Sequence, residues 1–175
     1  FFLFENRSDF SFRVRDQQRT GLGQYSSGLE QSYSRERSIR VRLQLVTEIS
    51  NQLEYINKQD NVAASVNSAR SRMIASDGLT SDYSYRPEQN VEVGFRIEVS
   101  RAEDVYASTP LASNFNSQSL HTAVSFQNAG QVRIDFSREE ILLENAPVDL
   151  LIPFELTGGR GEGKTFLWGV TFDYR

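Results

Sequence analysis

Cysteine is absent from this 175-residue chain, and histidine, tryptophan and methionine each occur once. The lack of cysteine excludes disulfide bonds and cysteine-ligated zinc sites. No apolar run approaches about 18 residues, so a transmembrane helix is excluded. Lysine is scarce, because only Lys58 and Lys164 occur among the 19 basic residues. The positive charge is therefore mostly arginine, which favours fixed bidentate pairing with carboxylates.

The 19 basic and 23 acidic residues are distributed along the whole chain and give a formal net charge of −4. Since no basic stripe is present to follow a nucleic-acid backbone, nucleic acid is not an expected partner. The mean hydropathy of −0.48 is typical of soluble proteins. Strands that alternate lipid-facing and lumen-facing residues also have a low mean hydropathy, so this value leaves a membrane β-barrel open.

Apolar and polar residues alternate with a period of two in several segments. Between Val91 and Ser100 every second residue is apolar, and the residues between them are polar or glycine. This period is that of a β-strand with one apolar and one polar face. The same alternation from Ile39 to Tyr55, interrupted only at Val46 and Thr47, predicts one unusually long strand, and it recurs from Thr165 to Arg175. Shorter copies lie at Phe10–Val14, Leu79–Tyr85, Leu120–Phe126 and Val132–Phe136.

Turn signals separate these segments. Hairpin-type turns are expected at residues 86–90 and 127–130, so neighbouring strands should be antiparallel. Longer polar stretches at Arg19–Ser34, Ala107–Gln118 and Thr157–Gly163 are predicted to be loops. The segment beginning at Ser137 fits either a helical turn or a strand. The sequence thus predicts an all-β antiparallel meander in one domain over residues 1–175, forming a transmembrane β-barrel of roughly eight to ten strands or a segment of a larger barrel.

The two predicted faces differ in chemistry. Strand length, aromatic residues near strand ends and mixed charge favour a barrel whose apolar face meets lipid. The predicted polar, lumen-facing residues are Arg13, Arg15, Arg40, Arg42, Glu48, Glu54, Glu92, Arg96, Glu98, Arg133 and Asp135. The predicted lipid-facing residues are Val41, Leu43, Leu45, Val93, Phe95, Ile97, Phe166, Trp168, Val170 and Phe172. A soluble extracellular or periplasmic β-sandwich that binds through its loops would show the same alternation.

One nucleotide-binding pattern, G-x-x-x-x-G-K-T, occurs at Gly158–Thr165. That motif requires a helix after its lysine, whereas the residues that follow alternate as a strand does. We therefore expect a glycine-rich loop leading into the last strand. A Ser-His nucleophile would need a serine within hydrogen-bond reach of His121, the single histidine. Ser125 lies four residues away, which is about 13 Å along a strand and beyond that reach. No catalytic, cofactor-binding or metal-ligating residue is predicted, and no enzymatic activity is expected.

The segments Phe136–Glu140, Pro153–Arg160, Gly163–Trp168 and Phe172–Arg175 together resemble the C-terminal region of large uncharacterised outer-membrane barrel proteins of the Bacteroidetes and Chlorobi lineage. The resemblance covers about the last quarter of the chain and includes no catalytic signature. It implies further strands after Arg175, so the chain is expected to be a fragment of a longer one. The expected function is an integral protein of the bacterial outer membrane with a structural, channel or transport-assembly role. Its expected partners are outer-membrane lipid and other envelope protein subunits.

Overall fold

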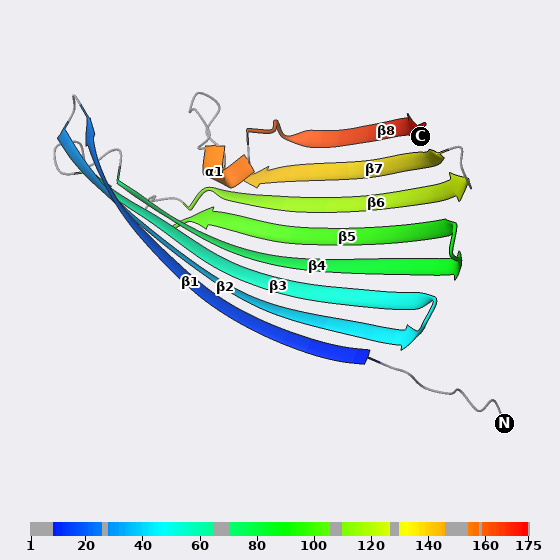
Figure 1. Ribbon diagram of the computed structural model, residues 1–175. Coiled ribbons are helices and arrows are strands. Elements are labelled where there is room, and N and C mark those ends of the chain that lie inside the picture. Colours follow the sequence, from blue (N-terminus) through cyan, green and yellow to red (C-terminus); the bar gives the residue numbers. More distant parts are fainter. Residues whose placement is uncertain are drawn as a thin grey trace.

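The computed structural model (Figure 1) describes residues 9–25, 28–64, 71–105, 110–126, 130–145, 154–157 and 159–174. These residues form eight strands and one helical turn. The elements are β1 (Asp9–Tyr25), β2 (Gly28–Val46), β3 (Ile49–Ala64), β4 (Arg72–Glu88), β5 (Val91–Asp104), β6 (Ala112–Phe126), β7 (Gly130–Glu144), α1 (Phe154–Thr157) and β8 (Gly163–Asp173).

All eight strands belong to one sheet and follow one another in chain order, each antiparallel to the next. The predicted all-β antiparallel meander is therefore confirmed. The sheet is not closed, since β1 and β8 lie at its two edges. The strands run from 11 residues in β8 to 19 in β2, compared with about five or six in most globular sheets.

The single long strand predicted from Ile39 to Tyr55 is wrong, because this segment is a hairpin. β2 ends at Val46 and β3 begins at Ile49. Because of a register shift between Gln44 and Val46, odd-numbered residues of β2 pair with odd-numbered residues of β3, as Leu43 does with Asn51. The alternation therefore has the same phase before and after the turn, so the short break at Val46 and Thr47 did not reveal the hairpin in the sequence.

Two of the predicted loops are also largely strand. The polar stretch Arg19–Ser34 forms the paired ends of β1 and β2, whose register continues to Tyr25 and Gly28. In the stretch Ala107–Gln118, β6 already begins at Ala112. Ladder hydrogen bonds form between backbones whatever the side chains are, so a segment that is polar on both faces can still be a strand. The segment beginning at Ser137, left open by the sequence, belongs to β7.

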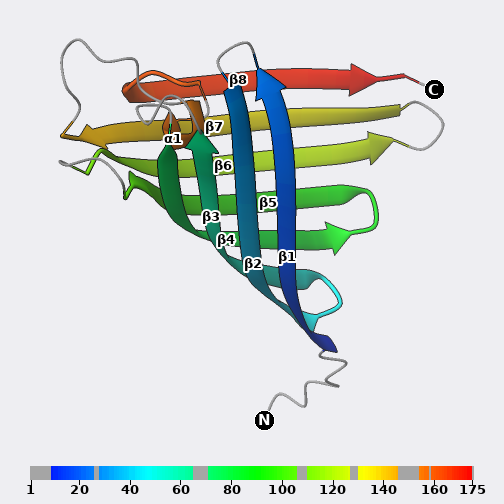
Figure 2. The same ribbon diagram turned by 90° about the vertical axis from the view of Figure 1, so that its left-hand side faces the viewer.

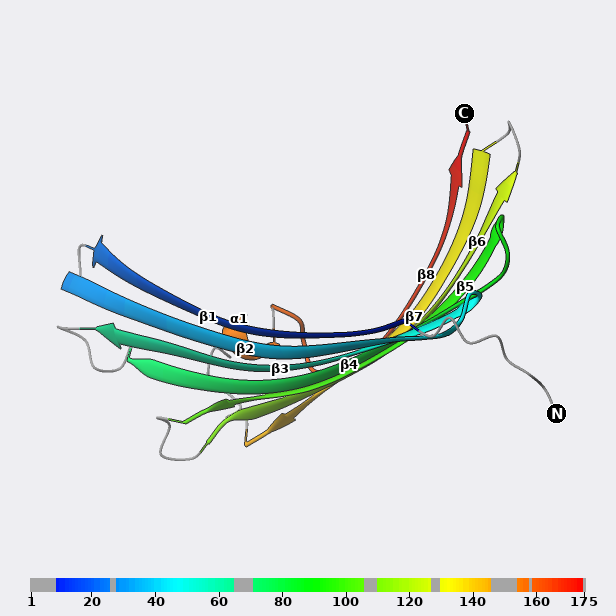
Figure 3. The same ribbon diagram turned by 60° about the horizontal axis from the view of Figure 1, so that its bottom comes forward.

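The sheet is strongly curved, and α1 lies on its concave side (Figures 2 and 3). We call the concave side the inner face and the convex side the outer face. Leu156 of α1 packs with Ile74 and Leu111 in a small buried cluster, with Ala102 at its margin. Among the described residues no large side chain is fully buried. The fold therefore depends on strand pairing rather than on a large apolar core.

The two ends of the sheet differ in their connections. The end that carries the β2–β3, β4–β5 and β6–β7 connections is called the turn end, and it lies on the right in Figure 1. There β2 and β3 are separated only by Thr47 and Glu48, and β4 and β5 only by Gln89 and Asn90. At the opposite end, called the loop end, the connections include residues 65–71, 105–111 and 145–162.

Candidate functional site

The inner face carries an unbroken polar row across the sheet. The strand register aligns one polar residue from each of the eight strands. These are Arg13, Arg40, Glu54, Thr80, Glu98, Ser117, Glu139 and Thr165. Parallel rows toward the turn end place Arg42, Arg96 and Asp135 on the same face, and Arg15 lies one row toward the loop end.

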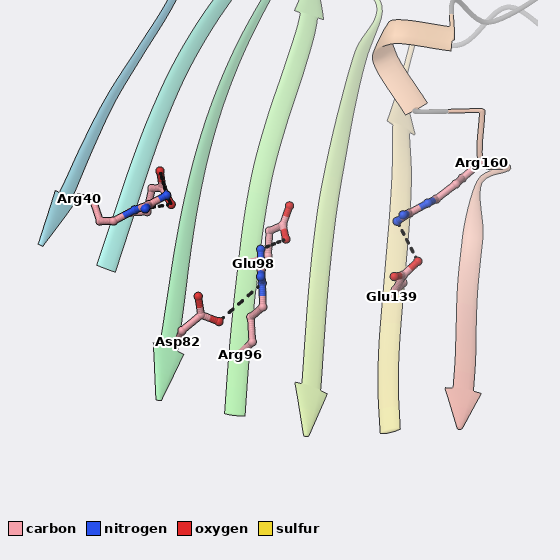
Figure 4. A network of polar contacts seen from close by, with 7 residues as sticks. Arg40, Asp82, Arg96, Glu98, Glu139 and Arg160 are labelled. Atoms are coloured by element: carbon pink, nitrogen blue, oxygen red, sulfur yellow. Dashed lines mark hydrogen bonds and ion pairs between the residues drawn. The ribbon is translucent and has the colours of Figure 1, made fainter. Parts of the chain in front are cut away.

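Ion pairs connect these side chains within and between strands (Figure 4). The Arg40 guanidinium donates to both oxygens of the Glu54 carboxylate on the neighbouring strand, with Nε–Oε2 and Nη2–Oε1 distances of 3.0 and 2.9 Å. Arg96 lies between two carboxylates, 3.7 Å from Asp82 on β4 and 3.3 Å from Glu98 on its own strand. Because each of these arginines has an acidic partner, the inner face carries paired charge.

The β7–β8 connection also contacts this face. Arg160, which follows α1, donates to Glu139 at 2.9 Å (Figure 4). Its guanidinium also lies 5.2 Å from the centre of the Phe115 ring. Further along β7, Arg133 pairs with Asp135 at 2.9 Å. Together with the burial of Leu156, the Arg160 contacts hold part of this connection on the inner face.

A second polar cluster surrounds Glu92 near the turn end. Its carboxylate lies 3.0 Å from Arg86 and accepts a hydrogen bond of 3.2 Å from the Ser84 hydroxyl. His121 Nε2 is 3.8 Å from the same carboxylate. The serine of this cluster thus donates to Glu92 rather than to His121, which is not the arrangement of a Ser-His nucleophile. Within the described ranges, no three His, Cys, Asp or Glu residues are grouped to hold a metal ion.

Glu48 departs from its predicted place. The sequence assigned it to the polar face of a long strand, but it lies in the β2–β3 turn. Its backbone carbonyl accepts a 2.7 Å hydrogen bond from the Arg86 amide, which joins this turn to the end of β4. The misassignment follows from the concealed hairpin, because a continuous alternation placed every even residue of the segment on one face.

The outer face is apolar over its central part. One register row there contains Phe10, Leu43, Asn51, Tyr83, Phe95, Leu120, Phe136 and Trp168, and only Asn51 is polar. All ten predicted lipid-facing residues lie on this face by register or by alternation within their strand. Leu43 and Trp168 are 40% and 81% exposed, because α1, the one described element outside the sheet, lies on the opposite face.

The apolar band of the outer face has a stepped edge on its loop-end side. On β1 to β5 this edge lies in one register row, which contains Val14, Ile39, Tyr55, Leu79 and Val99. The register partner of Val99 on β6 is Asn116, which pairs with Glu140, and Glu140 pairs with Lys164. On β6 the band therefore starts only at Leu120, two rows nearer the turn end, and on β8 it starts at Phe166, one row nearer that end than Val99.

Toward the loop end, the outer face becomes charged. We call this region the outer polar belt; it comprises Asp16, Arg35, Arg37, Asn57, Asp77, Arg101, Glu103, Asn114 and Glu144. Its members are connected across strands: Asp16 lies 2.7 Å from Arg35 and 3.4 Å from Arg37. Glu144 of β7 accepts hydrogen bonds from Arg101 of β5 at 3.3 Å and from Asn114 of β6 at 2.7 Å.

Two carboxyl groups of the outer polar belt, those of Asp16 and Asp77, have a lowered pKa. The hydrogen bond from Arg35 lowers the pKa of Asp16 below its usual value, and the nearby charges of Arg35 and Arg37 act in the same direction. The pKa of Asp77 is also lowered, first by the hydrogen bond from the Tyr55 hydroxyl and then by that from Asn57. Both carboxylates thus accept hydrogen bonds that favour the ionised state.

The glycine-rich segment before β8 does not lead into a helix. Lys164 and Thr165 belong to β8, and the Lys164 ammonium lies 3.2 Å from Glu140 on the adjacent strand. Gly163, with φ of 135°, adopts a backbone conformation that favours glycine at the start of the strand. The helix N-terminus on which this motif depends for phosphate binding is therefore not formed here.

Comparison with models of known protein families, with curated proteins and with solved structures gave no match. In the part of the chain that the structure describes, no helix is long and apolar enough to cross a membrane.

Proposed function

We propose that this chain forms part of an integral outer-membrane β-barrel, with its outer face in lipid and its inner face toward an aqueous lumen. One observation carries the proposal: among the described residues nothing covers the apolar face of the sheet, whereas α1, the one described element that packs on the sheet, lies on the polar face. Water-soluble sheets bury their apolar face, and contiguous exposed apolar areas larger than a few hundred Å² are rare on soluble proteins. A lipid environment removes this conflict.

We further propose that the barrel has more than eight strands. In a lipid layer, the unpaired backbone groups at the edges of β1 and β8 require hydrogen-bond partners, which additional strands would supply. The interior of a barrel of about eight strands is filled by side chains alone. Here the inner face carries long arginine–carboxylate pairs and also α1, so a wider lumen is needed.

The paired charges favour an anchoring or transport-assembly role over ion selection. Ion-selective pores present rings of one sign of charge. On the described inner face, Arg40, Arg96 and Arg160 each lie against a carboxylate, so neither sign predominates there. Outer-membrane lipid and other envelope subunits are the proposed partners.

The soluble β-sandwich is less well supported. A sandwich needs a second sheet to cover the apolar face of the first. The described strands all belong to a single sheet, and the one further element, α1, lies on the other face.

Detergent dependence and heat modifiability test the proposal. The protein is expected to need detergent to stay monodisperse, and the folded form should migrate differently from the boiled form on a gel. If the protein remains monodisperse with its β-sheet signal in the absence of detergent, the membrane proposal is wrong. If detergent is required but the mobility does not change, the lipid-facing surface is retained and the closed barrel is rejected.

A further inference from the structure

The outer face is asymmetric along the strands. At the turn end, apolar residues extend up to the turns, since Leu45 and Ile49 flank the β2–β3 turn and Val91 begins β5. At the loop end, the same face changes to the charged and amide side chains of the outer polar belt. The apolar band therefore reaches the turns at the turn end of the sheet. At the loop end it stops well before the strands do.

Beyond the outer polar belt, the hairpin of β1 and β2 is mostly polar on both faces, apart from the exposed Leu22 and Leu29. Gln17, Gln18, Arg19 and Thr20 follow one another in β1. The facing segment of β2, residues 31–36, contains only glutamine, serine, tyrosine, arginine and glutamate. A strand that is polar on both sides is suited to water on both sides. From Ser34 to Gly28 this extension measures about 20 Å at roughly 3.3 Å per residue.

The height of the apolar band fits a bilayer. On β5 it extends from Val91 to Val99, which is about 27 Å along the strand at roughly 3.4 Å per residue. A strand tilt of about 40° reduces this to about 21 Å along the membrane normal. Outer-membrane barrels have an apolar band about 25 Å tall, so the outer polar belt falls at the level of the lipid head groups.

We propose that the outer polar belt contacts the lipid head groups of the outer leaflet, and that the loop end projects into the external medium. This inference rests on the proposed function and adds depth and orientation to it. The arginines of the outer polar belt suit the phosphate of a zwitterionic head group, and the carboxylates of the belt suit its ammonium. The direction follows from the connections, because barrels of this class have short periplasmic turns and longer external loops.

The absence of cysteine makes a direct test possible, because single cysteines can be introduced without background from this chain. Three outer-face positions of β2 lie at increasing depth: Gln31 in the extension, Arg37 in the outer polar belt and Leu43 in the apolar band. Thr47 lies in the turn at the opposite end. The variants Gln31→Cys, Arg37→Cys, Leu43→Cys and Thr47→Cys would be made in the complete protein.

Two measurements use these variants. In intact cells of a Gram-negative host, a membrane-impermeant maleimide should label Gln31→Cys, and it should label Thr47→Cys only after the outer membrane is permeabilised. In phosphatidylcholine vesicles, a fluorophore on Arg37→Cys should be quenched at least about twofold more strongly by head-group nitroxides than by acyl-chain nitroxides. The order should reverse for Leu43→Cys, and Gln31→Cys should be quenched weakly by both.

The outcomes separate the two proposals. Labelling of Thr47→Cys but not Gln31→Cys in intact cells would overturn the orientation while leaving the barrel in place. An unquenched label on Arg37→Cys beside a quenched one on Leu43→Cys would place the belt in water, where it could bind a protein partner, and would overturn the head-group contact. If the Leu43→Cys label is quenched by neither probe, the proposed function itself fails.

Discussion

The imidazole of His121 lies directly against the backbone of Gly94 on the neighbouring strand. A Cβ atom added at Gly94 would be 1.9 Å from His121 Cε1 and 2.7 Å from Nδ1, so a larger residue displaces the ring. We expect Gly94→Ala to lower the free energy of unfolding by about 0.5–1.5 kcal/mol, the cost of turning the partly exposed His121 ring out of its rotamer. Urea titration of the protein folded into detergent or vesicles would measure this loss.

Gly169 provides the matched control. It lies on the same face and pairs with Asp135, but a Cβ there would meet nothing within 4 Å. Gly169→Ala should therefore be neutral or stabilising by up to about 1 kcal/mol, because it restricts the unfolded chain. The double variant Gly94→Ala/His121→Ala should recover most of the lost stability. Equal stability of Gly94→Ala and Gly169→Ala would contradict the close contact.

The cross-strand pair Arg40–Glu54 should contribute to stability. Its partners lie directly opposite each other, and the Glu54 side chain is only 16% exposed. A double-mutant cycle to alanine is expected to give a coupling free energy of about 0.5–1 kcal/mol. The more exposed pair Arg133–Asp135, on a single strand, serves as the control and should give close to zero. Equal coupling free energies in the two cycles would show that the position of Arg40 and Glu54 on neighbouring strands does not strengthen their interaction.

A charge on the outer face should be far more harmful than one on the inner face. In lipid vesicles, Phe95→Arg is expected to lower the free energy of unfolding by about 2–4 kcal/mol, because the guanidinium would enter the apolar layer. Ser117→Arg lies between Glu98 and Glu139 in the inner polar row, so it should change stability by less than about 0.5 kcal/mol. Equal losses for the two variants would be inconsistent with lipid on the outer face.

The outer polar belt predicts a loss of stability in acid. Because the pKa values of Asp16 and Asp77 are lowered in the folded state, their contribution is present above the unfolded pKa of about 4 and is lost as the pH falls through the folded values. The urea midpoint should stay level from about pH 7 to 5 and fall below about pH 4. In the double variant Asp16→Asn/Asp77→Asn the fall of the urea midpoint in acid should be smaller. If the midpoint falls as steeply as before, other carboxylates cause the loss of stability.

Leu156 should hold α1 on the inner face. Its side chain is 4% exposed and packs against Ile74 and Leu111. Leu156→Ala is expected to remove about 2–3 kcal/mol of local stability, seen as faster hydrogen exchange in α1 with little change in β1 and β2. Leu142→Ala, at a residue that is 51% exposed on the outer face, is the control and should leave the exchange of α1 unchanged.

The sequence predicted the local features of this sheet correctly. A strand directs successive side chains to opposite faces, so the alternation from Val91 to Ser100 was enough to identify β5 and its two faces. The same property identified β8 after the glycine-rich segment and separated Lys164 from any phosphate-binding helix. These results need no knowledge of neighbouring strands.

What depends on pairing between strands was decided only by the tertiary structure. The bulge near Gln44 that concealed a hairpin, the contact of His121 with Gly94 and the stepped edge of the apolar band all follow from register, which joins residues distant in the chain. Alternation shows that a strand has two faces but not which of them the sheet curves around. Curvature and the position of α1 identified the polar face as the inner one, because both are properties of the assembled sheet.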